Sequence, residues 1–278
     1  LAVIDEGEKF RVVHDATHRV KVNHGIRVPD AELVPGPAEV AAAVRADSVR
    51  EDRWNYRRLP KVRYLAAKAD IAMAHRRVPV REEDWGLMAC AIDDQGSLPD
   101  EEWILHLNKV GTYGVGSASW WWARVSALLT RLAHYVVPDI AWILRYADDF
   151  LMLLTIVPGM TWRTLLMIIL LWEALGVPIK WKKMKADILL DWIGFTFCFR
   201  EERLGMSTRR ASWLAAWYER VAKDGFVLGR DAKMALGRTG FAAEVLRHVR
   251  PFLAPLYTWT FAMPDGTVIP VPLAIRLL

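Results

Sequence analysis

The chain has 278 residues, of which 53% are apolar and 25% charged, a composition that excludes an intrinsically disordered protein. Its formal net charge is +5, and the basic surplus lies between residues 180 and 250, where 15 Lys and Arg stand against 8 Asp and Glu. Such a segment fits contact with a phosphate backbone and fits a solvated surface equally well. Two cysteines are too few for a disulfide framework, so we expect an intracellular protein of the cytoplasm or nucleus.

The most apolar run of the sequence covers residues 165–172, between Arg163 and Glu173. It is much shorter than the roughly 20 residues that cross a bilayer. We therefore expect a buried helix there and no membrane association. Because the sequence starts at Leu1, inside an apparent strand, we expect it to be a fragment of a longer polypeptide.

The first hundred residues predict short strands around one helix. Residues 9–13 (KFRVV) favour a strand, and the Ala-rich stretch 38–52 favours a helix with Pro37 at its start. An apolar strand over 62–69 is expected to end at Asp70. Further strands are expected at 87–92 and 103–107, separated by the turn-rich sequence DDQGSLPD.

The middle of the chain predicts two helices and an acidic hairpin. Helices are expected over 117–135, after Gly114 and Gly116, and over 161–175, where Gly176 and Pro178 end the pattern. Apolar strands at 140–146 and 150–157 enclose Asp148 and Asp149, which predicts a β-hairpin.

Residues 188–199 and 204–207 predict another hairpin, and the remainder from about 208 is expected to be all helical. The predicted fold class is α+β, with an antiparallel sheet in the body of the chain and a small helical module after it.

Asp148 and Asp149 are the strongest candidates for chemistry. Adjacent carboxylates at a hairpin tip repel each other and raise each other's pKa, and a divalent cation removes that cost. Magnesium prefers oxygen ligands, and a two-metal site needs another carboxylate, for which Asp70 is the candidate because it follows an apolar strand. The tetrapeptide YADD by itself fits an ordinary polar turn equally well.

The order of the motifs resembles that of reverse transcriptases of retrotransposon-like elements, over nearly the whole chain. The matching segments are KFRVVHD (9–15) for the fingers strand, ADIAMAHRRVPV (69–80) for the first palm motif, YGVGSASWWWARV (113–125) for the glycine-led motif, YADDF (146–150) for the catalytic turn, LGVPIKWKKMK (175–185) for the lysine segment, DWIGF (191–195) for the primer grip, and RTGFAAEVLRHVRPFLAPLY (238–257) for the thumb or connection region.

This resemblance implies a right-hand polymerase with partial fingers and a palm in residues 1–207, followed by a helical thumb-like region in 208–278. It implies DNA synthesis from dNTPs on a primed RNA or DNA template, with two Mg²⁺ ions, for which Mn²⁺ is a substitute. The implied catalytic residues and metal ligands are Asp70, Asp148 and Asp149. The implied nucleotide-binding residues are Lys9, Arg11, His75, Gly114 and Lys183. The implied primer grip is Trp192, Ile193 and Gly194.

The sequence departs from the family at several of these positions. His75 stands where Phe or Tyr usually blocks a ribose 2′-hydroxyl, and Ser119 stands where Pro is usual. An RNA-dependent RNA polymerase is a rival interpretation, although its turn more often carries Gly at the position of Ala147. A degenerate polymerase that only binds nucleic acid is the other rival.

Several other residues are weaker candidates. His14 and His18 have the spacing of two metal ligands on a helix, but their surroundings favour a strand and a turn. Trp213 and Trp217 fit core packing better than base stacking. The basic residues Arg209, Arg210, Arg220 and Lys223 fit a duplex backbone or a solvated helix face.

Overall fold

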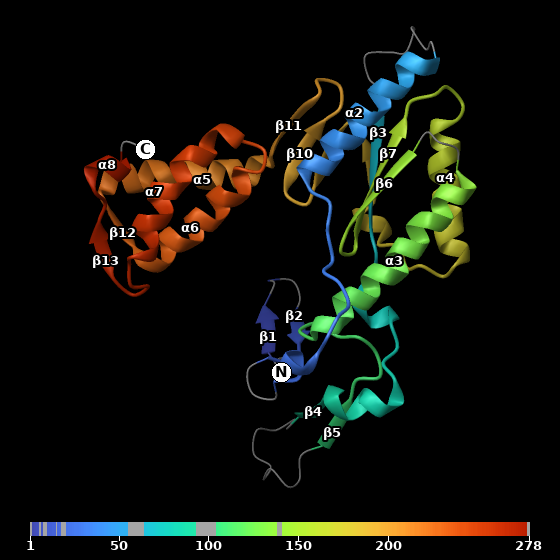
Figure 1. The fold of residues 1–278 in the computed structure, drawn as a ribbon, viewed down its shortest axis with the longest axis horizontal. Coiled ribbons are helices and arrows are strands. Elements are labelled where there is room, and N and C mark those ends of the chain that lie inside the picture. Colours follow the sequence, from blue (N-terminus) through green and yellow to red (C-terminus); the bar gives the residue numbers. More distant parts are fainter. Residues whose placement is uncertain are drawn as a thin grey trace. The chain divides into compact units, whose positions relative to one another are not determined.

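A computed structural model describes residues 2–5, 7, 10–14, 16–17, 21–54, 64–92, 104–137 and 141–276 (Figure 1). The chain forms two compact units. The first comprises Leu1–Val34, Lys68–Met152 and Gly159–Met184, and the second comprises Pro35–Ala67, Leu153–Pro158 and Lys185–Leu278. Within the described ranges, none of the helices has both the length and the apolar character that a bilayer crossing requires.

A four-stranded sheet with the order β6-β7-β3-β8 carries the acidic residues. Its strands are β3 (Tyr64–Asp70), β6 (Ala141–Tyr146), β7 (Asp149–Thr155) and β8 (Lys185–Asp187). Five consecutive residues of β7, from Phe150 to Leu154, are fully buried. Such a continuous apolar run is typical of a strand that is covered on both faces. The predicted hairpin around the paired aspartates is confirmed.

Two long helices belong to the first unit, and both were predicted. They are α3 (Gly116–Val136) and α4 (Thr161–Ala174), which pack against each other (Figure 1). The buried Trp172 of α4 lies against Phe150 of β7, with ring centroids 4.8 Å apart. This packing fixes α4 to the strand that begins at Asp149.

The remaining elements of the first unit are short. They are the hairpin β1 (Ala2–Asp5) and β2 (Phe10–Val13), helix α1 (Val22–Gly25), the 3₁₀ turns η1 (Ala74–Arg77), η2 (Glu82–Met88) and η4 (Trp181–Lys183), and the antiparallel pair β4 (Ala89–Ile92) and β5 (Ile104–Leu107). The strand expected over 87–92 begins only at Ala89, because the two residues before it close the turn η2.

The second unit begins with helix α2 (Pro37–Trp54), as predicted, and contains a three-stranded meander. Its strands β9 (Leu189–Trp192), β10 (Phe195–Cys198) and β11 (Arg203–Met206) pair antiparallel in the order β11-β10-β9. The prediction of one strand over 188–199 is wrong. Ile193 and Gly194 have φ values of 44° and 88° and reverse the chain between β9 and β10.

The C-terminal part of the second unit is mainly helical. Its helices are α5 (Thr208–Asp224), α6 (Gly229–Ala242), α7 (Arg250–Phe261), preceded by the 3₁₀ turn η5 (Arg247–Val249), and α8 (Leu273–Arg276). The prediction of an all-helical module is wrong in one respect, since β12 (Phe226–Leu228) and β13 (Val268–Pro270) form a small antiparallel sheet. Trp217, Val221 and Ala235 belong to its buried core, as expected for Trp217.

Candidate active site

Asp70 is the last residue of β3 and is 7% exposed. Its backbone is held on one side, where the Lys180 amide donates to the Asp70 carbonyl at 2.8 Å. The next residue, Ile71, donates its amide to the carbonyl of Asp148 at 3.0 Å. These bonds bring the end of β3 and the tip of the β6–β7 hairpin together, as the sequence predicted for one edge of a sheet.

The hairpin tip consists of Ala147 and Asp148, because Asp149 already belongs to β7. Ala147 adopts a left-handed conformation with φ 51°, which is uncommon for a residue other than glycine. The Ala147 carbonyl accepts hydrogen bonds from Trp122 Nε1 at 2.9 Å and from Arg145 Nη1 at 3.3 Å. The turn is therefore fixed by side chains that lie outside it.

Two lysines neutralise Asp70. Lys180 Nζ donates to one oxygen of the Asp70 carboxylate, and Lys183 Nζ donates to the other at 2.8 Å. Lys180 Nζ also lies 3.8 Å from an oxygen of Asp148. The hydrogen bond to Asp70 raises the pKa of Lys183, so this lysine keeps its charge at neutral pH.

Asp149 lies in an environment that disfavours the charged form of its carboxyl group. Burial raises the pKa of its carboxyl, and the charges of Asp70 and Asp148 raise it further, while Lys183 and Lys68 lower it. The charges of Asp70 and Asp148 therefore repel the ionised form of Asp149. A cation between them would lower that repulsion.

The three carboxylates supply oxygen atoms, the ligand type that Mg²⁺ prefers. The three side chains are not arranged around a common point, because both carboxylate oxygens of Asp70 accept hydrogen bonds from lysines. Among the described residues, no group of three or more His, Cys, Asp or Glu side chains is arranged to hold a metal ion. Binding would require the lysines to leave Asp70.

The residues predicted to contact a nucleotide lie in several different elements. His75 lies in η1, and its ring meets the edge of Tyr113 with centroids 5.1 Å apart. Burial lowers the pKa of His75, while the negative charges of Asp148 and Glu32 raise it. His75 therefore lies within the electrostatic reach of the acidic turn.

Gly114 has φ 94°, and a Cβ atom there would lie 1.9 Å from the carbonyl oxygen of His14. Glycine is therefore required at position 114, because the backbone of His14 leaves no room for a side chain. Arg11 lies in β2, where it pairs with Ile4. Lys9 and His18 lie outside the described residues.

The predicted primer grip forms the tight turn between β9 and β10. Trp192 is 2% exposed, whereas Ile193 and Gly194 are half-buried. A Cβ atom on Gly194 would lie 2.4 Å from the guanidinium of Arg210. This turn therefore contacts the first turn of α5.

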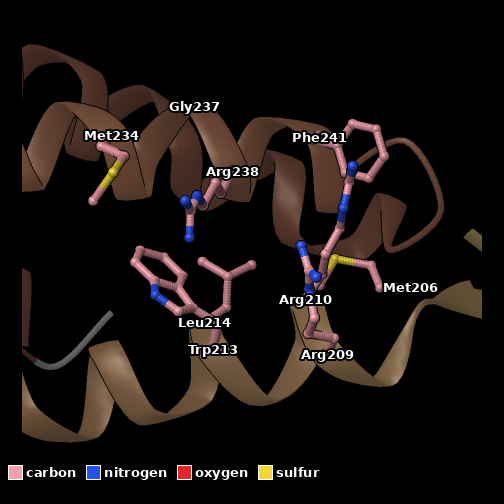
Figure 2. Close-up of a pocket in the computed structure, with 9 residues that line it drawn as sticks. All are labelled: Met206, Arg209, Arg210, Trp213, Leu214, Met234, Gly237, Arg238 and Phe241. Atoms are coloured by element: carbon pink, nitrogen blue, oxygen red, sulfur yellow. The ribbon is translucent and has the colours of Figure 1, made fainter. Parts of the chain in front are cut away.

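Beside Arg210, a cavity of about 720 Å³ lies between α5 and α6 (Figure 2). Arg210 of α5 extends over the ring of Phe241 at 4.4 Å, and Arg238 of α6 lies over the ring of Trp213 at 3.7 Å. Within the described part of the chain, no carboxylate lies within 4 Å of these two arginines or of Arg209. Arg209 and Arg210 lie in the first turn of α5, where the helix dipole is positive and disfavours cations. Their two charges add to the positive potential at this end of the helix.

Three residues that contact the predicted site residues or their flanking segments were not identified from the sequence. Lys180 lies in a segment that was recognised, but Lys183 alone was assigned to it. Asn23 joins the glycine-led motif, donating to the Gly114 carbonyl at 2.8 Å and accepting from the Gly116 amide at 2.8 Å. Arg145 directly precedes the YADD motif, and this position was its only signal.

No protein-family model and no curated protein matches this sequence. Among solved structures, the foamy viral protease-reverse transcriptase in complex with dsDNA is similar, with a TM-score of 0.58 and 15% identity. The similarity covers 96% of this chain and 47% of the viral chain, so this chain spans about half the length of that protein.

A likeness at this level of identity concerns the fold, which is like that of a reverse transcriptase. The mixed α/β architecture and the antiparallel sheets agree with the fold class expected from the sequence.

Proposed function

We propose that this protein is a template-directed polymerase that synthesises DNA from dNTPs on a primed RNA or DNA template. The observation that carries the proposal is the hydrogen bond between the Ile71 amide and the Asp148 carbonyl, at 3.0 Å. It holds the acidic turn against the end of the strand that bears Asp70, in a fold like that of a reverse transcriptase.

Asp70, Asp148 and Asp149 would hold two Mg²⁺ ions, or Mn²⁺ in their place. When bound, these ions supply charge stabilisation for the attacking and leaving oxygens of phosphoryl transfer. Lys180 and Lys183 are bound to Asp70 and carry the charge that triphosphate oxygens attract. They would exchange the carboxylate for phosphate when a nucleotide enters. His75 would contact the sugar, and Lys9, Arg11 and Gly114 would complete the nucleotide site.

The nucleic acid would contact the second unit. Ile193 and Gly194, with Trp192 behind them, would hold the primer end. The arginines around the cavity beside them would bind backbone phosphates, since guanidinium groups form bidentate hydrogen bonds with phosphate. The dsDNA of the similar viral structure is consistent with this role.

Primer extension on an RNA template tests the proposal, with Mg²⁺ and either dNTPs or NTPs. Extension by dNTPs is expected, and Asp148→Asn should abolish it without loss of the folded state. Asp187→Asn, on β8, is the matched control and should extend normally. Extension with NTPs alone would instead favour an RNA polymerase. A folded protein that binds the primed template but never extends it would contradict the proposal and support a degenerate, binding-only polymerase.

A further inference from the structure

Glu32 reaches the acidic turn through a partner side chain. Glu32 Oε1 lies 2.8 Å from Nη2 of Arg145, and the two side chains are only 21% and 12% exposed. At this degree of burial, each group depends on the other for charge compensation. The guanidinium is thereby held in one orientation, with its other terminal nitrogen free to donate elsewhere.

That other nitrogen, Nη1 of Arg145, donates to the Ala147 carbonyl at 3.3 Å. The same carbonyl accepts from Trp122 Nε1 at 2.9 Å, and Trp122 is almost fully buried. Because Ala147 stands in the left-handed region, its peptide plane needs such external support. The two donors together fix the peptide group that precedes Asp148.

The peptide group on the other side of Asp148 is fixed as well, because its carbonyl accepts the Ile71 amide. With both flanking peptides held, the Asp148 side chain has a defined direction relative to Asp70. The chain of contacts therefore runs from Glu32 to Arg145, to the turn carbonyl and to the backbone of Asp148.

We infer that Glu32 is a positioning residue for nucleotidyl transfer, acting through Arg145 on the Ala147 carbonyl to set the orientation of Asp148. This inference rests on the function proposed above for Asp148. Glu32 touches neither substrate nor metal in this role. Burial lowers the pKa of His75, and the negative charges of Asp148 and Glu32 partly offset that effect, so Glu32 acts electrostatically on the same residue as the acidic turn.

A neighbouring pair provides a matched control. Asp30 lies two residues before Glu32 and also binds an arginine, Arg124, together with the Trp120 indole at 2.8 Å. Both partners of that pair are about half exposed, and neither contacts the turn. Asp30→Ala therefore removes an equivalent tether of the same segment without touching the Ala147 carbonyl.

Single-nucleotide incorporation kinetics test the inference. Glu32→Ala is expected to lower kcat by about tenfold, since small misplacements of reacting groups are costly, with KM for the nucleotide changed less than about twofold. Glu32→Gln, which keeps an acceptor for Arg145, should recover part of the rate. The double variant Glu32→Ala/Arg145→Ala should be no slower than Arg145→Ala alone, because the two residues act as one unit.

Hydrogen exchange at the Ile71 amide separates this inference from the proposed function. Faster exchange in Glu32→Ala than in wild type or Asp30→Ala is expected, even if the wild-type protein proves inactive. If the wild type does not extend primers, the proposed function fails while this measurement still decides whether Glu32 orders the turn. Unchanged exchange and kcat in a folded Glu32→Ala protein, or equal losses in Asp30→Ala, would overturn the inference.

Discussion

The ionisation of Asp149 opposes the folded state, because its carboxyl has a raised pKa. Its pKa is raised by burial and by the neighbouring carboxylates, so the protonated form favours folding at low pH and this contribution is lost as the pH rises through the folded pKa. Asp149→Asn stays neutral at every pH. We expect it to raise the free energy of unfolding by about 1 kcal/mol at pH 7 while reducing primer extension.

Urea denaturation of both proteins at pH 7 and at about pH 4, near the ordinary pKa of Asp, measures this effect. The gain should shrink at the lower pH. Glu83→Gln, which removes an exposed carboxylate, is the control and should change little. An equal gain at both pH values would show that the charge of Asp149 is not its cause.

Lys183 is expected to bind the nucleotide, whereas its neighbour Lys182 is not. Hydrogen bonds to charged groups contribute about 1.5–3 kcal/mol, so Lys183→Ala should raise KM for dNTP by about tenfold or more. Lys182→Ala removes the same charge one residue away and forms no contact with Asp70. Steady-state incorporation with both variants is the measurement, and equal KM values would refute the assignment.

At the level of elements, the turn between β9 and β10 combines strain with a proposed function. Both of its residues have positive φ, a geometry that favours Asn-Gly, yet the first is the β-branched Ile193. Ile193→Asn should therefore stabilise the protein by about 1 kcal/mol and raise KM for the primer. Ile193→Val, which stays β-branched, should leave stability nearly unchanged. The urea midpoint decides, and a lower midpoint for Ile193→Asn would contradict this account.

The elements that were predicted well carry strong local patterns. The hairpin around Asp148 and the helix α4 follow from long apolar runs and from turn residues. The β9–β10 turn was missed because its apolar residues continue the pattern of a single strand, and only Gly194 interrupts it. The pair of Glu32 and Arg145 could not be predicted, because nothing local relates two residues so distant in the chain.

For the whole molecule, the basic C-terminal region should appear in the salt dependence of nucleic-acid binding. Each phosphate contact contributes about one unit to the slope of log K against log salt. Arg209→Ala and Arg238→Ala should each lower that slope by about one, whereas Arg200→Ala, on an exposed loop outside the cavity, should not. Titrations of primed duplex with the Asp148→Asn protein avoid extension. Unaltered slopes would exclude phosphate contacts at the cavity.

The two ammonium groups on Asp70 act as internal counterions for that carboxylate. On the function proposed above, metal binding would be an exchange, in which an ion replaces lysines that then need a new anionic partner. A nucleotide triphosphate would supply that partner. The two ligands would therefore be thermodynamically coupled, and each should tighten the binding of the other by the same factor. On this proposal, either ligand alone would bind more weakly than it binds in the presence of the other.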